Sequence, residues 1–215
     1  MAGIIDFGDF ERKTCASCGC YWDYNIFDKS KLKTVFDKYF FLDIDYCPNC
    51  YYVGPDVAQL NKKIKDEIDS GKYKKHLKAF KENFMLTTRQ EAFQFIVHAM
   101  ICEEMGDYQA AAISYYNGAL LEQDMIDKYV ESSLYSERDE RDRKEYEKEV
   151  EKHFISSYEC AKKCLSEENI DMYIFLCGLS KKLKKQEEFI TLFTKIVKGF
   201  AFNKQQAEVL KELRG

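Results

Sequence analysis

Two Cys-x-x-Cys pairs, separated by 28 residues, constrain this 215-residue chain more than any other feature. The first is Cys-Ala-Ser-Cys at 15–18, followed by Gly19, and the second is Cys-Pro-Asn-Cys at 47–50. Each pair can form a tight turn that points two thiolates at one ion, and a glycine after the first pair supplies the backbone freedom that such a turn favours. We therefore expect one structural, tetrahedral Zn²⁺ with four ligands: Cys15, Cys18, Cys47 and Cys50.

The nine cysteines of the chain allow other roles as well. An odd number of cysteines without an export signal argues against a disulfide framework. A catalytic disulfide between Cys15 and Cys18 would normally stand at a helix N-terminus in an α/β fold, and no such pattern surrounds them. Cys20 could compete with Cys18 as a ligand, but the spacing and the following glycine favour Cys18. The Cys-x-x-Cys-Gly and Cys-Pro-x-Cys pattern also resembles rubredoxin, which implies iron as the alternative metal. The alternative function is a metal-thiolate redox protein or sensor that uses rubredoxin-like iron or releasable zinc.

Composition and charge favour a protein that acts in the cytoplasm. The net charge is −4, and the start, Met-Ala-Gly-Ile-Ile-Asp-Phe, has no basic residue and no long apolar stretch, so we expect no signal peptide. No apolar run is long enough to cross a bilayer, so no membrane association is expected. Residues 58–89 hold nine Lys or Arg against four acids. This modest excess is more typical of a solvated helix face than of a nucleic-acid surface, so a zinc ribbon that binds nucleic acid is only an alternative function.

No catalytic machinery is recognisable in the sequence. It contains no H-E-x-x-H motif, phosphate loop, dinucleotide fingerprint or nucleophile elbow. The three histidines, His76, His98 and His153, fall in helical patterns, where a structural role is the more common one. The sequence therefore names no catalytic residue and favours a non-enzyme.

The hydrophobic pattern changes near residue 55. Residues 1–55 hold 13 of the 32 aromatic residues, and Phe40–Tyr46 alternates as a half-buried strand does, with Asp43 and Asp45 on its outer face. Beyond this point apolar residues recur at helical spacing, with breaks at Gly106-Asp107 and near 184–186. We expect a mostly α fold with a small N-terminal β zinc-ribbon-like module, 1–55, and a helical domain of antiparallel hairpins, 56–215.

Part of the helical region resembles a tetratricopeptide repeat. The resemblance rests on large and small residues at fixed spacing around a Gly-Asp-Tyr turn: Phe95, His98, Ala99, Cys102, Gly106, Asp107, Tyr108, Ala112, Tyr116 and Ala119. A weaker match without that turn uses Tyr173, Leu176, Cys177, Phe189, Phe193 and Ile196. The helical region is therefore expected to be tetratricopeptide-like, with an irregular bundle as the alternative.

The whole order of features resembles a family of bacterial cytosolic proteins with an N-terminal zinc-ribbon-like segment and a tetratricopeptide-like helical region. In that family the second pair typically reads Cys-Pro-x-Cys-Gly-Tyr, whereas this chain has Tyr51 and Tyr52 after Cys50. The family has no established activity, so the resemblance implies the architecture and the zinc but no mechanism. We expect a non-catalytic, zinc-binding scaffold whose helices bind a protein partner.

Overall fold

The computed structural model describes residues 10–25, 29–72, 87–131, 140–166 and 168–215. Helices make up 67% of these residues, so the fold is mostly α, as the sequence predicts. The strands are β1 Phe10–Thr14, β2 Tyr21–Asn25, β3 Asp45–Tyr46 and β4 Val53–Gly54. The helices are the 3-10 turn η1 Lys29–Lys31, α1 Val35–Tyr39, α2 Lys62–Asp69, α4 Thr87–Glu104, α5 Tyr108–Glu131, α6 Glu140–Lys163, α7 Ile170–Lys182, α8 Gln186–Gly199 and α9 Lys204–Arg214.

The four strands form two separate antiparallel hairpins, β1–β2 and β3–β4. The strand expected over Phe40–Tyr46 is therefore much shorter than predicted, because only its last two residues pair with β4. The outward position expected for Asp45 is also wrong. Asp45 is 5% exposed, and its carboxylate accepts hydrogen bonds from Lys13 Nζ at 2.6 Å and from the Val57 amide at 3.3 Å. A charged side chain can be buried there because the distant Lys13 neutralises it.

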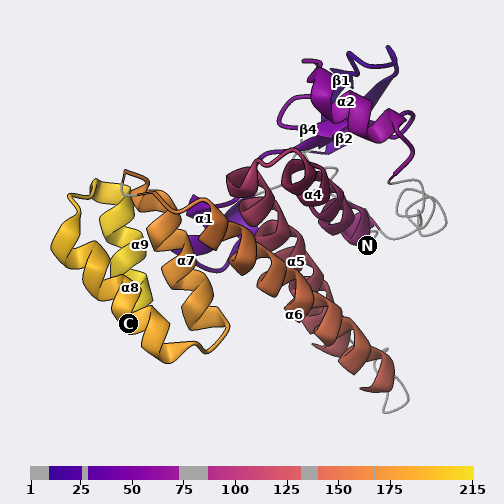
Figure 1. The fold of residues 1–215 in the computed structure, drawn as a ribbon. Coiled ribbons are helices and arrows are strands. Elements are labelled where there is room, and N and C mark those ends of the chain that lie inside the picture. The colour runs from indigo at the N-terminus through magenta and orange to yellow at the C-terminus, as the bar shows by residue number, and fades with distance from the viewer. Residues whose placement is uncertain (1–9, 26–28, 73–86, 132–139, 167) are drawn as a thin grey trace.

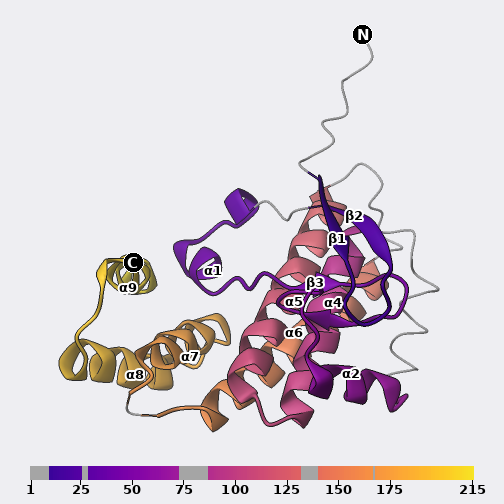
Figure 2. The same ribbon diagram turned by 90° about the horizontal axis from the view of Figure 1, so that it is seen from above.

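Long helices pack side by side to form most of the core. Helices α4 and α5 are joined by a tight turn at Gly106, whose φ of 77° lies in the left-handed region that ends many helices. Small side chains, Ala99 in α4 with Ala112 and Ala119 in α5, are fully buried and let helices approach closely. Helix α6 lies along α5, and α7 and α8 form a second hairpin that breaks between Lys182 and Gln186, as predicted (Figures 1 and 2).

The lengths of the paired helices do not decide whether they are tetratricopeptide repeats, so that assignment stays a prediction. The 18-residue α4 and the 24-residue α5 together exceed the roughly 34 residues of one tetratricopeptide repeat. Helices α7 and α8, with 13 and 14 residues, fit that length.

The buried side chains form two clusters, and each cluster contains a different part of the N-terminal segment. The two hairpins pack with α2 and α4, whereas α1 packs with the helices of the other cluster. The Phe36 ring lies parallel to the Phe175 ring, with 6.0 Å between centroids, and a Cβ atom at Gly178 would overlap it. The carboxylate of Glu212 in α9 accepts hydrogen bonds from the backbone amides of Val35 and Phe36, at 3.1 and 2.8 Å. The division at residue 55 stays a prediction.

The two ends of the molecule therefore carry different parts of the chain. Figure 1 shows β1, β2 and α2 beside α4 at one end, and α7, α8 and α9 at the other. Figure 2, from above, shows the same separation, with α1 on the side of α7 and α9.

Candidate metal centre

The first Cys-x-x-Cys pair forms the turn of the β1–β2 hairpin. The Cys15 amide donates to the Cys20 carbonyl at 2.8 Å, and the Gly19 amide donates back to the Cys15 carbonyl at 2.8 Å. The Ser17 amide lies 3.3 Å from Cys15 Sγ and donates to it. Backbone hydrogen bonds thus hold the turn closed and place a partial positive charge beside one sulfur.

The second pair repeats this arrangement in the turn of the β3–β4 hairpin. The Cys47 amide donates to the Tyr52 carbonyl at 2.8 Å, and the Tyr51 amide donates to the Cys47 carbonyl at 2.9 Å. Tyr51 has φ 65° and Gly19 has φ 72°, so both turns use a left-handed residue directly after their second cysteine. Two matching turns therefore face each other, as two knuckles around a common ion would.

The four sulfur atoms lie close enough to share one ion. All four Sγ atoms lie within 4.8 Å of one another. Cys15 Sγ lies 3.6 Å from Cys50 Sγ, and Cys18 Sγ lies 3.7 Å from Cys47 Sγ. Four sulfurs in a tetrahedron at about 2.3 Å from a central Zn²⁺ stand about 3.8 Å apart. The two short separations match that value, so the thiols are positioned to hold a metal ion.

The environment of the four thiols is uneven. Cys15 and Cys47 are buried, Cys50 is half-buried and Cys18 is exposed. The Asn49 side-chain amide lies 3.5 Å from Cys18 Sγ, and this hydrogen bond lowers the pKa of Cys18 to about 6. Burial raises the pKa values of Cys47 and Cys50, so these thiols keep their protons unless a cation replaces them.

The knuckles are anchored to the rest of the core. The Ala16 amide donates to the Val57 carbonyl at 2.8 Å, which ties the first turn to the segment before α2. The buried Tyr52 hydroxyl donates to the Gln59 carbonyl at 2.9 Å and accepts the Asn61 amide at 2.6 Å. The centre thus connects both hairpins to the start of α2.

The remaining cysteines lie apart from this group. Cys20 Sγ lies 3.8 Å from the Tyr21 carbonyl oxygen and is not among the four clustered sulfurs, whereas Cys18 is. The other four, Cys102, Cys160, Cys164 and Cys177, lie in or directly after α4, α6 and α7. Among the described residues, no second group of metal-ligating side chains clusters as closely.

The histidines and the basic run show structural contacts where they are described. His98 is buried, with Nδ1 2.8 Å from Ser114 Oγ, and His153 Nδ1 lies 2.8 Å from Glu122. Lys65 pairs with Asp69 on the exposed face of α2. His76 and residues 73–86 of the basic run lie outside the described residues.

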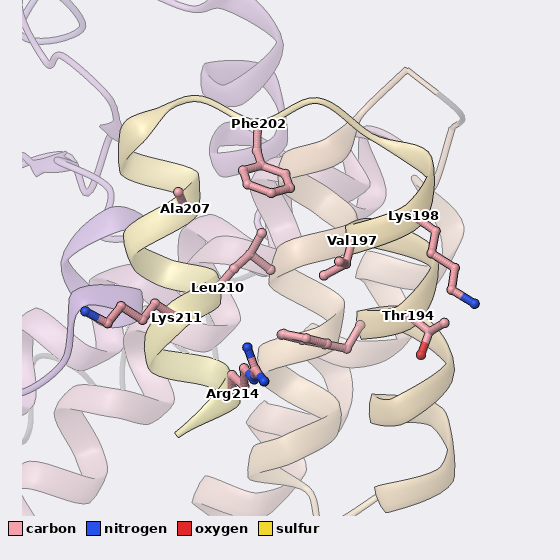
Figure 3. A pocket seen from close by; sticks show the side chains of 9 residues that line it. Thr194, Val197, Lys198, Phe202, Ala207, Leu210, Lys211 and Arg214 are labelled. Carbon is pink, nitrogen blue, oxygen red and sulfur yellow. The ribbon is translucent and has the colours of Figure 1, made fainter.

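Two features of functional interest escape a reading of the sequence. Asn49 sits inside the second Cys-x-x-Cys pair, but nothing in its position indicates that its amide reaches Cys18 of the other pair. The second is an apolar groove between α8 and α9 (Figure 3). The sequence gives no signal for this groove, because it depends on how two separate helices lie in space.

Comparison with protein-family models, with curated proteins and with solved structures finds no match to this chain, so no family is assigned. Within the described part of the chain, no helix is both long and apolar enough to cross a membrane.

Proposed function

We propose that Cys15, Cys18, Cys47 and Cys50 hold one structural Zn²⁺, and that the chain is a non-catalytic protein-interaction scaffold. The observation that carries the proposal is the group of four Sγ atoms within 4.8 Å at the turns of two hairpins. Four thiolates complete a tetrahedral zinc shell and leave no position for water or substrate. A closed site of this kind cross-links structure and does not activate a ligand.

The position of the centre supports a structural role. The strands of one hairpin have five residues each and those of the other have two, so neither hairpin is large enough to be stable alone. The metal would join the two hairpins where they pack with α2 and α4. The helical part contributes paired helices, tetratricopeptide-like in the proposal, whose outer faces would bind a protein partner. Nine free cysteines suit the reducing cytoplasm, which is the proposed location.

The proposal is tested on protein purified without added metal. Elemental analysis is expected to give about one zinc per chain, and the visible spectrum is expected to show no colour. Chelation is expected to expose the N-terminal hairpins to limited proteolysis while α5–α8 stay resistant. A variant with all four cysteines changed to serine should behave like the chelated protein.

Three outcomes would overturn the proposal. Unchanged protease resistance after chelation would remove the structural role. Stoichiometric iron with a red colour, in protein expressed with both metals present, would make rubredoxin-like electron transfer the better account. If the purified chain contained no metal, the proposal that the four cysteines bind an ion would be wrong.

A further inference from the structure

A groove runs between α8 and α9 at the end of the molecule that lies away from the metal centre (Figures 1 and 3). Its volume is about 550 Å³. Helix α9 packs on α1 and α7, and α8 packs on α7, so the two helices flank an opening that neither fills. Nine residues line it: Phe193, Thr194, Val197, Lys198, Phe202, Ala207, Leu210, Lys211 and Arg214.

The groove exposes apolar side chains that the fold itself does not cover. Val197 is 50% exposed and Phe202 is 43% exposed. Figure 3 shows Phe202, Val197 and Leu210 directed into the space between the two helices. A ligand that covered these exposed apolar side chains would gain free energy by removing them from water.

Three of the lining residues are cationic. Figure 3 shows Arg214 at the lower part of the space between the two helices, whereas the Lys198 and Lys211 side chains extend outward from α8 and α9. Lys198, Lys211 and Arg214 are all exposed, and no acidic residue lines the groove. None of the three cations forms an ion pair with a described residue of the chain. Arg214 beside the apolar floor, with the flexible side chains of Lys198 and Lys211 on the flanks, favours an apolar ligand that carries negative charge at its edges.

We propose that this groove binds an acidic amphipathic helix of a partner protein. The proposal rests on the scaffold function above and names the chemistry of its partner. A channel between two helices accepts a third helix whose apolar residues recur at i, i+3, i+4 and i+7. Glutamate or aspartate beside that apolar face would pair with Arg214, and with Lys198 and Lys211 where these long side chains turn toward the ligand. A second copy that docked symmetrically through the same groove would instead bring these cations against their own counterparts.

The direct test uses two synthetic, end-capped, fluorescent peptides of equal length. Both carry leucine at i, i+3, i+4 and i+7, and their remaining charged positions are glutamate in one and lysine in the other. By fluorescence anisotropy with the zinc-containing full chain, the acidic peptide should bind at least about ten-fold more tightly at low salt. That preference should shrink at high salt, because screening weakens surface pairs.

Two variants locate the binding. The double change Val197→Asp and Phe202→Asp should weaken the acidic peptide at least about ten-fold, whereas Ile155→Asp should not, since Ile155 is similarly exposed, at 45%, but lies on α6. The triple change Lys198→Glu, Lys211→Glu and Arg214→Glu should reverse the preference between the peptides. Lys204→Glu, on α9 but outside the groove, is its control.

A measurement on the unchanged chain keeps the test independent of whether the variants fold. In methyl NMR spectra, the acidic peptide should shift the Val197 and Leu210 signals and leave those of Ile64 and Val53 in place. Equal binding of both peptides, no binding of the acidic peptide, or shifts elsewhere would overturn the proposal. Concentration-dependent dimerisation that Val197→Asp abolishes would also overturn it, because the occupant would be a second copy.

Failure of this proposal is distinguishable from failure of the proposed function. The same preparations are assayed for zinc content and for protease resistance after chelation. Bound zinc with chelation-sensitive hairpins but no peptide binding would reject only the groove. Peptide binding by a chain without any metal would reject only the metal centre.

Discussion

The hydroxyl of Tyr116 in α5 donates a hydrogen bond to the carboxylate of Asp37 in α1. Both side chains are buried, with 2% and 5% of their surfaces exposed. The bond joins the N-terminal segment to the centre of the helical core, 79 residues further along the chain. It therefore gives a way to test whether α1 is part of that core.

Changing Tyr116 to Phe should lower the free energy of unfolding by about 1–3 kcal/mol, because it removes a donor from a buried carboxylate. Urea denaturation followed by circular dichroism measures this difference. The control is Tyr21→Phe, since Tyr21 is 68% exposed and its change should have no measurable effect. Equal stability of Tyr116→Phe and the unchanged chain would show that the bond adds nothing.

Gly19 offers a test of the first knuckle. Its φ of 72° lies in the left-handed region, and a Cβ atom there would meet no heavy atom within 4 Å. Gly19→Ala should therefore cost about 1–2 kcal/mol through the backbone alone. Gly199→Ala is the matched control, because its Cβ is equally unhindered and its φ is not positive, so thermal denaturation should show little change.

The choice between Cys18 and Cys20 as ligand is tested by two single changes. Cys18→Ser should sharply lower the zinc affinity, because a four-sulfur shell loses one thiolate. Cys20→Ser should leave metal content and affinity unchanged, since its sulfur lies outside the clustered group. Competition with a chromophoric chelator measures both affinities, and the reverse order of effects would mean that Cys20 is the ligand.

The buried His98 predicts a pH dependence of stability. Burial lowers the pKa of its imidazole to about 4 from 6.5. Between these values the unfolded chain binds a proton that the folded chain does not, so stability falls as the pH falls. This side chain alone should account for about 2 kcal/mol of loss between pH 7.5 and pH 5.

The measurement for His98 compares the unchanged chain with His98→Gln at each pH. Acid would also displace a metal ion bound by the four clustered cysteines, because protons compete for thiolate ligands. This effect is common to both proteins, so the difference in pH slope isolates the histidine. Parallel pH profiles would contradict a lowered pKa at His98.

Local chemistry made parts of this structure predictable. The cluster of four cysteines follows from two Cys-x-x-Cys spacings. Each pair forms its own turn locally, so the fold has only to bring the two turns together. The break at Gly106 and the division between α7 and α8 follow from the residues at those points. These features depend on neighbours in sequence, which a pattern records.

Long-range contacts explain what the sequence could not show. Alternation placed Asp45 outside, but Lys13, 32 residues away, neutralises it in the interior. Nothing in the pattern of residues 29–41 indicates that α1 docks on α7 and α9, through Glu212, which is 177 residues from Val35. The groove between α8 and α9 likewise depends on how two helices diverge in space.

The most direct test of the metal centre is X-ray absorption at the zinc edge on protein purified without added metal. The account predicts about one zinc per chain, surrounded by four sulfur atoms at about 2.3 Å and by no nitrogen or oxygen. A shell containing nitrogen or oxygen ligands, or iron in place of zinc, would contradict a structural zinc held by Cys15, Cys18, Cys47 and Cys50.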